Sequence, residues 1–197
     1  MINKNIFFIG ILLLINPTTA FGEWQIKPFI GLAFGGDTTF IDVENAAQTP
    51  NITFGASGLL LGELFGVEAD IGHAPGFFQS DDRQLVQKSS VTTASGSVVV
   101  ALPRRLSEYG LRPYFVSGAG VMHVTIDHHL GVLKVSSTLP AIHIGGGATG
   151  FFNSRLGLSW DVRHYYSIGE QTQGKGLSFG AEKLSFWRAT MALALRY

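Results

Sequence analysis

The histidines are the residues whose type and spacing most directly suggest chemistry in this chain. His123 and His143 flank a polar segment that holds three further candidate ligands, Asp127, His128 and His129. If the flanking segments form a hairpin about a turn near Leu133, His123 and His143 lie opposite one another, and such a set could hold zinc or nickel. The simpler interpretation, which the sequence favours, is that both histidines are inward polar groups that bind no metal.

Two other patterns look like active-site motifs but lack the geometry that those motifs need. Ser159, Asp161 and His164 could form an acid–base set, yet on a strand His164 faces away from the other two. Residues 145–150 fit the glycine pattern of dinucleotide-binding loops, but a strand continues after them and no helix begins. We therefore predict no catalytic, cofactor-binding or metal-binding residue, and we expect a protein that is not an enzyme.

The composition of the chain excludes several classes of protein. Its 14 Lys and Arg balance 14 Asp and Glu, so no basic excess points to nucleic acid as a partner. The chain has no Cys, which excludes disulfides and thiolate metal sites. Beyond its first residues it has no run of about eighteen apolar residues, so no transmembrane helix is expected. Such a hydrophobic chain is either a soluble β-protein with a core or a β-barrel that faces lipid.

Residues 1–22 have the layout of a secretory signal peptide. A lysine supplies the positive start, residues 6–15 form an apolar core, and a polar stretch with small residues follows from Asn16 to Ala20, so cleavage is expected after Ala20 or Gly22. An N-terminal membrane anchor is the alternative, but the apolar core is too short to span a bilayer and Pro17 ends it. We expect residues 1–22 to be removed on export and residues 23–197 to form one outer-membrane barrel domain.

The rest of the chain is predicted to form eight strands with connections of alternating length. The strand-like segments are 24–35, 52–62, 65–72, 91–102, 112–125, 141–152, 155–166 and 185–197. The connections after the first, third, fifth and seventh segments are long, whereas those after the second and sixth are tight. This alternation is typical of transmembrane barrels with short periplasmic turns and long outer loops. The predicted fold is therefore all-β, an eight-stranded antiparallel transmembrane up-and-down barrel.

The last segment shows the clearest alternation. Counting back from Tyr197, every second residue is apolar as far as Trp187, and the residues between them are small or polar. Successive side chains of a strand point to opposite faces, so one face is predicted to lie against lipid. An aromatic residue at each end of that face suits the two interfaces of a bilayer. The other aromatic residues assigned to the interfaces are Trp24, Phe34, Tyr114 and Tyr166.

The opposite faces of the strands carry the charges. The predicted inward charges are Glu68, Asp70, Arg155, Asp161, Arg163, Arg188 and Arg196. Both signs are present, and an eight-stranded barrel is just wide enough for side chains to fill it, so we expect these groups to pair across the lumen. The two arginines of the last strand are expected to pair with Glu68 and Asp70. A narrow water path through the lumen is the alternative.

The order of these features resembles the small eight-stranded outer-membrane barrels related to the opacity, OmpA-like and OmpX-like proteins. The resemblance covers essentially all of residues 23–197 and is carried by residues 66–72, 112–120 and 195–197. It implies the same barrel, assembly by the barrel-insertion machinery with periplasmic chaperones, and surroundings of outer-membrane lipid and lipopolysaccharide. Family members end more often in Phe than in Tyr, so Tyr197 departs from the pattern. No particular ligand is implied, since fold does not fix function.

Two functions from different classes are compatible with these features. The favoured one is a monomeric, non-enzymatic outer-membrane barrel that supports the envelope or contacts host or surface ligands through its outer loops. The alternative is an enzyme that modifies lipid A, of the deacylase or acyltransferase type, which needs a nucleophile, a base and an orienting group near the outer leaflet. A soluble lipocalin-like carrier is a third interpretation, and it requires apolar residues inside the barrel and charged residues outside.

Overall fold

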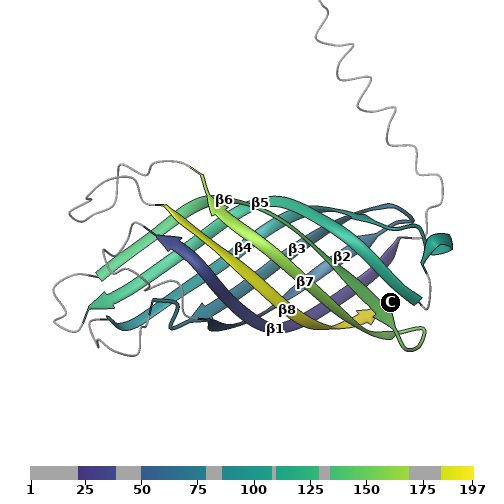
Figure 1. The fold of residues 1–197 in the computed structure, drawn as a ribbon, viewed down its shortest axis with the longest axis horizontal. Coiled ribbons are helices and arrows are strands. Elements are labelled where there is room, and N and C mark those ends of the chain that lie inside the picture. The colour runs from purple at the N-terminus through teal and green to yellow at the C-terminus, as the bar shows by residue number, and fades with distance from the viewer. Residues whose placement is uncertain (1–21, 39–49, 79–85, 108–109, 129–133, 169–182) are drawn as a thin grey trace, which may run out of the picture.

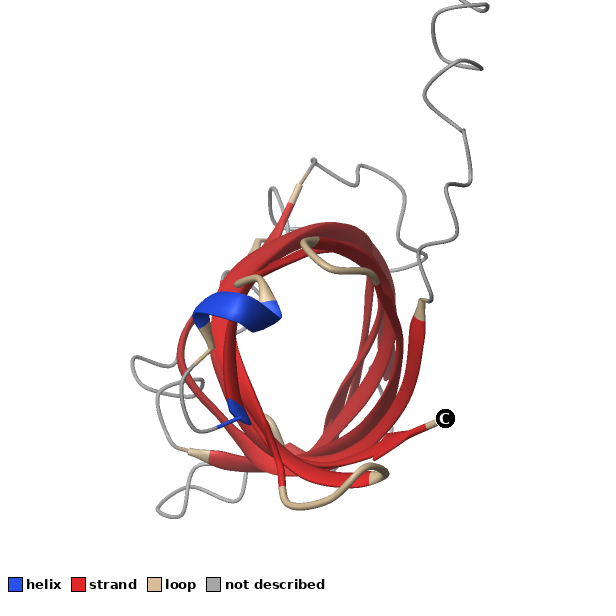
Figure 2. Ribbon diagram, turned by 90° about the vertical axis from the view of Figure 1, so that its right-hand side faces the viewer, coloured by secondary structure: helices blue, strands red, loops and turns tan. Residues whose placement is uncertain are grey.

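Eight antiparallel strands close into a barrel in the computed structural model, which describes residues 22–38, 50–78, 86–107, 110–128, 134–168 and 183–197 (Figures 1 and 2). The strands are β1 (Glu23–Thr38), β2 (Asn51–Leu61), β3 (Phe65–Pro75), β4 (Val86–Ala101), β5 (Leu111–His128), β6 (Lys134–Phe151), β7 (Leu156–Ser167) and β8 (Leu184–Arg196). Each strand pairs with the next, and β8 pairs with β1. The predicted up-and-down barrel is confirmed. All but Gly22 of the predicted signal peptide lies outside the described residues, so that segment stays a prediction.

The two ends of the barrel differ in their connections. At one end, here termed the turn end, short connections join β2 to β3, β4 to β5 and β6 to β7, and a 3-10 turn, η1 (Arg104–Leu106), lies at the rim (Figure 2). The opposite end is termed the loop end. There β6 begins earlier than predicted, so that Pro140, which lies outside the predicted strand, pairs with Val121. No helix in the described ranges is long and apolar enough to cross a membrane.

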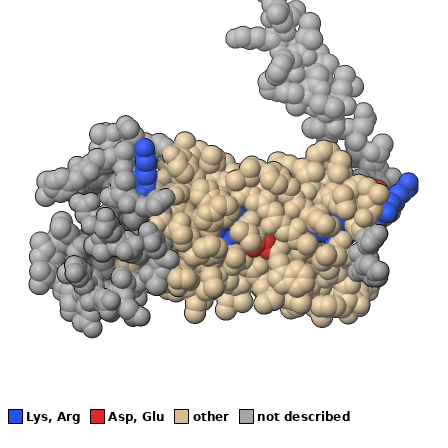
Figure 3. All heavy atoms as spheres, in the orientation of Figure 1, with Lys and Arg blue, Asp and Glu red and all other residues tan. Residues whose placement is uncertain are grey.

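The strands turn their apolar rows outward and their polar rows inward. On β8, Trp187, Met191 and Leu193 are each more than 40% exposed, whereas Arg188 and Thr190 are buried. Every Lys, Arg, Asp and Glu of the strands whose side chain is described lies on an inward row. The face in Figure 3 is accordingly mostly uncharged between its two ends, with only small patches of Lys or Arg and Asp or Glu atoms visible near its centre. The lipocalin-like interpretation requires the reverse arrangement, which this barrel does not have.

The interior consists of three layers along the barrel axis. At the loop end lies an apolar cluster with residues from every strand except β2, and the rings of Phe77, Phe186 and Tyr165 contact one another in series within it. A smaller apolar cluster at the turn end comprises Leu59, Leu61, Val99, Ala101, Tyr114 and Val116. Buried charged and hydroxyl side chains occupy the layer between them. The polar middle layer is therefore covered on both sides by apolar packing.

Candidate functional site: a charged network in the lumen

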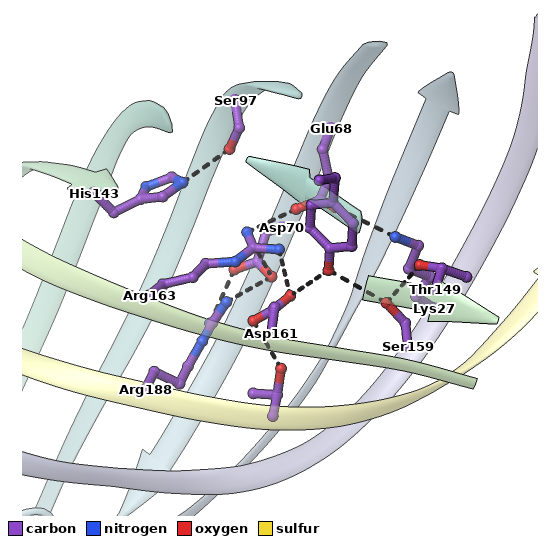
Figure 4. A network of polar contacts seen from close by, with 12 residues as sticks. Lys27, Glu68, Asp70, Ser97, His143, Thr149, Ser159, Asp161, Arg163 and Arg188 are labelled. Carbon is purple, nitrogen blue, oxygen red and sulfur yellow. Dashed lines mark hydrogen bonds and ion pairs between the residues drawn. The ribbon is translucent and has the colours of Figure 1, made fainter. Parts of the chain in front are cut away.

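The middle layer of the lumen contains three cations and three carboxylates, shown in Figure 4. Lys27 comes from β1, Glu68 and Asp70 from β3, Asp161 and Arg163 from β7, and Arg188 from β8. All except Asp161 are buried. The layer is neutral as a whole, because the two signs are equal in number. Each buried charge costs several kcal/mol unless it is well paired, so the geometry of pairing decides whether this layer is stable.

Arg188 forms the best-defined pair of the network. Its Nη1 and Nη2 donate hydrogen bonds to Oδ1 and Oδ2 of Asp70 at 3.0 and 2.9 Å, the two-pronged geometry in which a guanidinium binds a carboxylate most strongly. The guanidinium carbon also lies 4.8 Å from the ring centroid of Phe29 and 4.9 Å from that of Tyr165. Such cation–π contacts add stabilisation where the cation is removed from water. The predicted pairing of Arg188 with a carboxylate of β3 is confirmed.

Arg163 connects the remaining carboxylates. Its Nη1 lies 2.7 Å from Oε1 of Glu68, and its Nη2 donates a hydrogen bond to Oδ2 of Asp161 at 2.8 Å. Nη1 is also 3.9 Å from Oδ2 of Asp70. Because β3 and β7 are separated by three strands in either direction around the barrel, this one guanidinium bridges opposite walls of the lumen.

Lys27 is a member of the network that was not among the predicted lumen charges. Its Nζ lies 4.0 Å from Oε2 of Glu68 and 4.9 Å from the ring centroid of Tyr114. The sequence did carry a signal for it, because the apolar residues Trp24 and Ile26 alternate in β1 and put Lys27 on the inward row. With Lys27 included, the cations and carboxylates of the layer balance.

Hydroxyl groups bind the carboxylate oxygens of Asp161 from two further strands. The hydroxyl of Tyr114 donates to Oδ2 at 3.1 Å, and that of Thr190 donates to Oδ1 at 3.0 Å. Ser159 extends this set, with its Oγ 3.3 Å from the Tyr114 hydroxyl and 2.8 Å from that of Thr149. Neutral donors of this kind satisfy buried carboxylates without adding another charge.

The position of Tyr114 corrects its assignment to the membrane interface. Its side chain is inward and 8% exposed, whereas the adjacent Phe115 is 49% exposed on the outer wall. Two neighbouring aromatic residues must face opposite sides of a strand. Because the rest of this strand is rich in glycine, its pattern of side chains does not show which of the two faces outward. The buried hydroxyl contacts of Tyr114 are visible only in the folded barrel.

Two predicted lumen charges lie elsewhere. Arg155 is exposed in the turn between β6 and β7, where its backbone N–H donates to Oδ1 of Asn153 at 2.8 Å. Arg196 lies at the turn end, with its Nη1 3.4 Å from Oε1 of Glu23, and not beside the carboxylates of β3. The prediction for Arg155 was wrong because β7 begins one residue later, at Leu156, which leaves Arg155 in the turn. The prediction for Arg196 was wrong because the inward row runs the full length of β8, and only its central part lies at the depth of the network.

Inward glycines leave the space that the large cations occupy. A Cβ at Gly72 would lie 2.6 Å from Nη1 of Arg188. A Cβ at Gly145 would lie 2.9 Å from Cγ of Arg163 and 2.3 Å from a backbone oxygen of β7. Interiors are packed closely enough that one added methyl group must displace something, so these glycines and the two arginines depend on one another.

Beside the network, Ser97 and His143 form a pair with the composition of a catalytic dyad. Oγ of Ser97 is 3.0 Å from Nε2 of His143, and the histidine ring lies against Tyr165 with centroids 4.9 Å apart. The sequence did not predict this pair because β5 separates the two strands, and Gly118 of β5 lets the side chains meet across it. Both are buried inside the barrel. A nucleophile must be reached by its substrate, and the packing here is that of a structural contact.

The register of the hairpin β5–β6 separates the two histidines that were considered as metal ligands. His123 pairs with Thr138, and His143 pairs with Gly118. His123 lies on the outer wall with Nδ1 2.8 Å from Oγ1 of Thr138, whereas His143 is inward. The premise of the metal hypothesis is therefore wrong, and the prediction that both histidines are inward is wrong for His123. No group of three or more His, Asp or Glu in the described part of the chain could hold a metal ion, and the side chains of residues 127–129 lie outside that part.

The same architecture occurs in small outer-membrane barrels of known structure. Neisserial surface protein A matches with a TM-score of 0.60 and 10% identity, over 86% of this chain and 95% of that one. The N-terminal barrel domain of Pseudomonas aeruginosa OprF matches with a TM-score of 0.55 and 14% identity, over 89% of this chain and 99% of that one. Yersinia pestis Ail, solved with the heparin analogue sucrose octasulfate, matches with a TM-score of 0.52 and 14% identity, over 89% of this chain and 99% of that one. This chain has the fold of the small outer-membrane barrels.

The likeness concerns the fold alone, because these identities are low. No family model and no curated protein matches the sequence. The resemblance to small eight-stranded outer-membrane barrels that the sequence suggested is thus confirmed as architecture. Function has to be argued from the wall and the lumen of this barrel.

Proposed function

We propose that this protein is an integral outer-membrane barrel with a closed lumen, and that its role is structural or surface-binding and not enzymatic. The observation that carries the proposal is the side-chain arrangement across the wall, which is apolar outside and charged but neutral inside. Lipid covers an apolar outer wall, and a closed sheet leaves no edge strand unpaired in the bilayer. In this orientation the turn end faces the periplasm and the loop end faces the cell exterior.

The packing of the lumen favours a closed barrel over a narrow pore. Arg163 and Arg188 are 1% and 2% exposed and bridge opposite walls at the centre. Above them, Phe77 and Phe186 of the loop-end cluster are equally buried. Ions need a continuous polar path, and a bridged charge layer covered by aromatic rings obstructs one. The lumen charges therefore stabilise the wall.

The lipid A-modifying alternative needs its reactive groups where the lipid lies. Acyl chains of lipid A lie against the outer wall, whereas Ser97 and His143 point into the lumen. On the outer wall, His73 and His123 contact threonine hydroxyls at 2.9 and 2.8 Å, His123 also lies 3.4 Å from Oγ of Ser136, and the ring of His164 lies against that of Trp187. In the described part of the chain, the groups beside these histidines are hydroxyls and aromatic rings, without the carboxylate that orients the base of a serine–histidine site. This distribution supports the non-enzymatic proposal.

The partners follow from the same proposal. The chain is inserted by the barrel-insertion machinery with periplasmic chaperones, lies among outer-membrane lipid and lipopolysaccharide, and acts as a monomer, since its sheet closes on itself. We propose surface contacts at the loop end, and the likeness to Ail, which was solved with a sulfated heparin analogue, supports a surface-binding role.

Three measurements test the proposal. The protein should fractionate with the outer membrane and show heat-modifiable gel mobility, and a periplasmic soluble pool would contradict it. Purified protein in planar bilayers should give no steady conductance, and stable unitary currents would support the narrow-pore alternative instead. Mass spectra of lipid A from cells with and without the protein should agree, whereas a changed acyl pattern would identify an enzyme.

A further inference from the structure

The turn end of the barrel holds a cavity that the charged network does not use. Its volume is about 230 Å³, and its walls are mostly apolar, formed by Leu59, Leu61, Val99, Ala101 and Phe151. For comparison, an engineered apolar cavity of roughly 150 Å³ binds benzene. The cavity at the turn end thus has room for a larger apolar group, which would pack on the turn-end cluster.

The mouth of the cavity is positively charged. The charged residues that line it are Arg104, Arg112, Arg196 and Glu23. Glu23 pairs with two of the arginines, Arg104 and Arg196. Three arginines against one carboxylate leave a net charge of +2 among these lining residues.

Two of the arginines hold this charge in different ways. Arg112 is fixed, because its Nε donates to the carbonyl oxygen of Leu102 and its Nη2 to that of Gly62, both at 2.9 Å. These acceptors are neutral backbone carbonyls, so the guanidinium of Arg112 is held in place without a hydrogen bond to a carboxylate. Arg104 has a side chain that is 61% exposed, so its guanidinium can reach an incoming anion while it remains beside Glu23. The mouth therefore has one arginine held in place, Arg112, and one exposed hydrogen-bond donor, Arg104.

We propose that this cavity binds a single-chain amphiphile with an anionic head, of the class of medium-chain fatty acids. The chain packs against Leu59, Leu61 and Val99, and the carboxylate accepts hydrogen bonds from Arg104 at the mouth. A cavity of roughly 150 Å³ holds the six carbons of benzene, so the volume of about 230 Å³ suits a chain of about eight carbons. This inference rests on the proposed function in one respect only: if the turn end faces the periplasm, the ligand reaches the cavity from the periplasm.

Titration of sodium octanoate into methyl-labelled protein in lipid nanodiscs tests the site. The methyl signals of Leu59, Leu61 and Val99 are expected to shift saturably at submillimolar ligand. The outward methyls of Val98 and Leu193, 55% and 41% exposed, report partitioning of octanoate into the lipid and are expected to change only in proportion to concentration. Proportional changes at both sets, or none at the inward methyls, would overturn the proposal.

A matched pair of charge variants tests the anionic head. Arg104→Gln should raise the Kd for octanoate at least threefold, whereas Arg105→Gln, at the exposed next position outside the cavity lining, should leave it unchanged. The neutral analogue 1-octanol should bind at least threefold more weakly than octanoate to the unmodified protein. Equal Kd values for both variants together with equal binding of octanol would overturn the anionic class.

A second matched pair tests the location of the chain. Val99→Phe fills the cavity and should abolish the octanoate-induced shifts of Leu59 and Leu61, whereas Val98→Phe adds the same volume on the outer wall and should preserve them. Heat-modifiable mobility shows which variants fold, and if Val99→Phe does not, the arginine pair decides alone. Persisting shifts in folded Val99→Phe would overturn the location. Conductance and lipid A spectra are independent of octanoate, so failure here is distinguishable from failure of the closed-barrel function.

Discussion

Arg188 of β8 holds Asp70 of β3 by two hydrogen bonds of 3.0 and 2.9 Å across the lumen. The two residues are 118 positions apart in the chain, and both side chains are almost completely removed from solvent. Neither would be stable at that depth alone, because an uncompensated buried charge costs several kcal/mol. The pair therefore links the last strand of the barrel to its first half.

Alanine substitutions at this pair should be strongly non-additive. Arg188→Ala or Asp70→Ala alone should lower the free energy of unfolding by about 3–5 kcal/mol, because each leaves its partner buried without the two hydrogen bonds of this pair. The double variant should lose clearly less than the sum of the two. Urea unfolding in lipid vesicles, followed by tryptophan fluorescence, measures all three, and additive losses would contradict the pairing.

Two neighbouring glycines should respond to alanine in opposite ways. A Cβ at Gly118 would lie 2.3 Å from the backbone oxygen of Gly96 and 2.8 Å from Cε1 of His143, whereas a Cβ at Gly96 would meet nothing within 4 Å. Gly118→Ala should therefore cost about 1–3 kcal/mol through overpacking. Gly96→Ala should be neutral or stabilise by up to about 1 kcal/mol. The same urea assay applies, and equal effects of the two substitutions would argue against the packing of the lumen.

An arginine on the outer wall should cost stability according to its depth. Met191 is outward in the middle of β8, and Leu195 is outward near the turn end. Met191→Arg should destabilise by about 2–4 kcal/mol, while Leu195→Arg should cost about 1 kcal/mol or less. Unfolding in vesicles compares them. If the two substitutions lower the free energy of unfolding equally, or if neither lowers it, lipid does not cover this wall.

Removal of Tyr197 should impair assembly more than removal of a loop side chain. The backbone N–H of Tyr197 donates to the carbonyl oxygen of Trp24 at 2.9 Å, so the terminal residue extends the seam between β8 and β1. Deletion of Tyr197, or Leu195→Asp on the same outer row, should lower the amount of heat-modifiable protein in the outer membrane several-fold. Gln171→Ala, in the connection between β7 and β8, is the control. Equal yields would refute a special role of Tyr197 in the seam.

Local alternation made the wall predictable from the sequence. Strands such as β3 and β8 alternate strictly, so the residue order alone places Ile71 and Met191 outward and Asp70 and Arg188 inward. The prediction that inward charges of both signs would pair also holds, because a lumen of this width brings them within reach of one another.

Register was not predictable, because it depends on strands that accept several alignments. In β5 and β6 the glycines and small hydroxyl residues fit more than one pairing, and the observed register pairs Asp127 with Lys134, which differs from the register assumed for a turn near Leu133. A shift of the register by an odd number of residues exchanges the two faces of a strand. The observed register is shifted by five residues from the expected one, so His123 lies opposite Thr138 and not opposite His143. The Ser97–His143 contact depends on two successive registers and on a missing side chain between them, so no local pattern indicates it.

The composition of the middle layer has a consequence for assembly. Lys27, Glu68 and Asp70 give the first four strands a net network charge of −1, and Asp161, Arg163 and Arg188 give the last four a net charge of +1. Neither half can enter hydrocarbon as a neutral body, and each lacks the partner that the other supplies. The charges of each half are therefore fully paired only when β1–β4 and β5–β8 are both in place, so complete pairing of the network and closure of the barrel depend on one another.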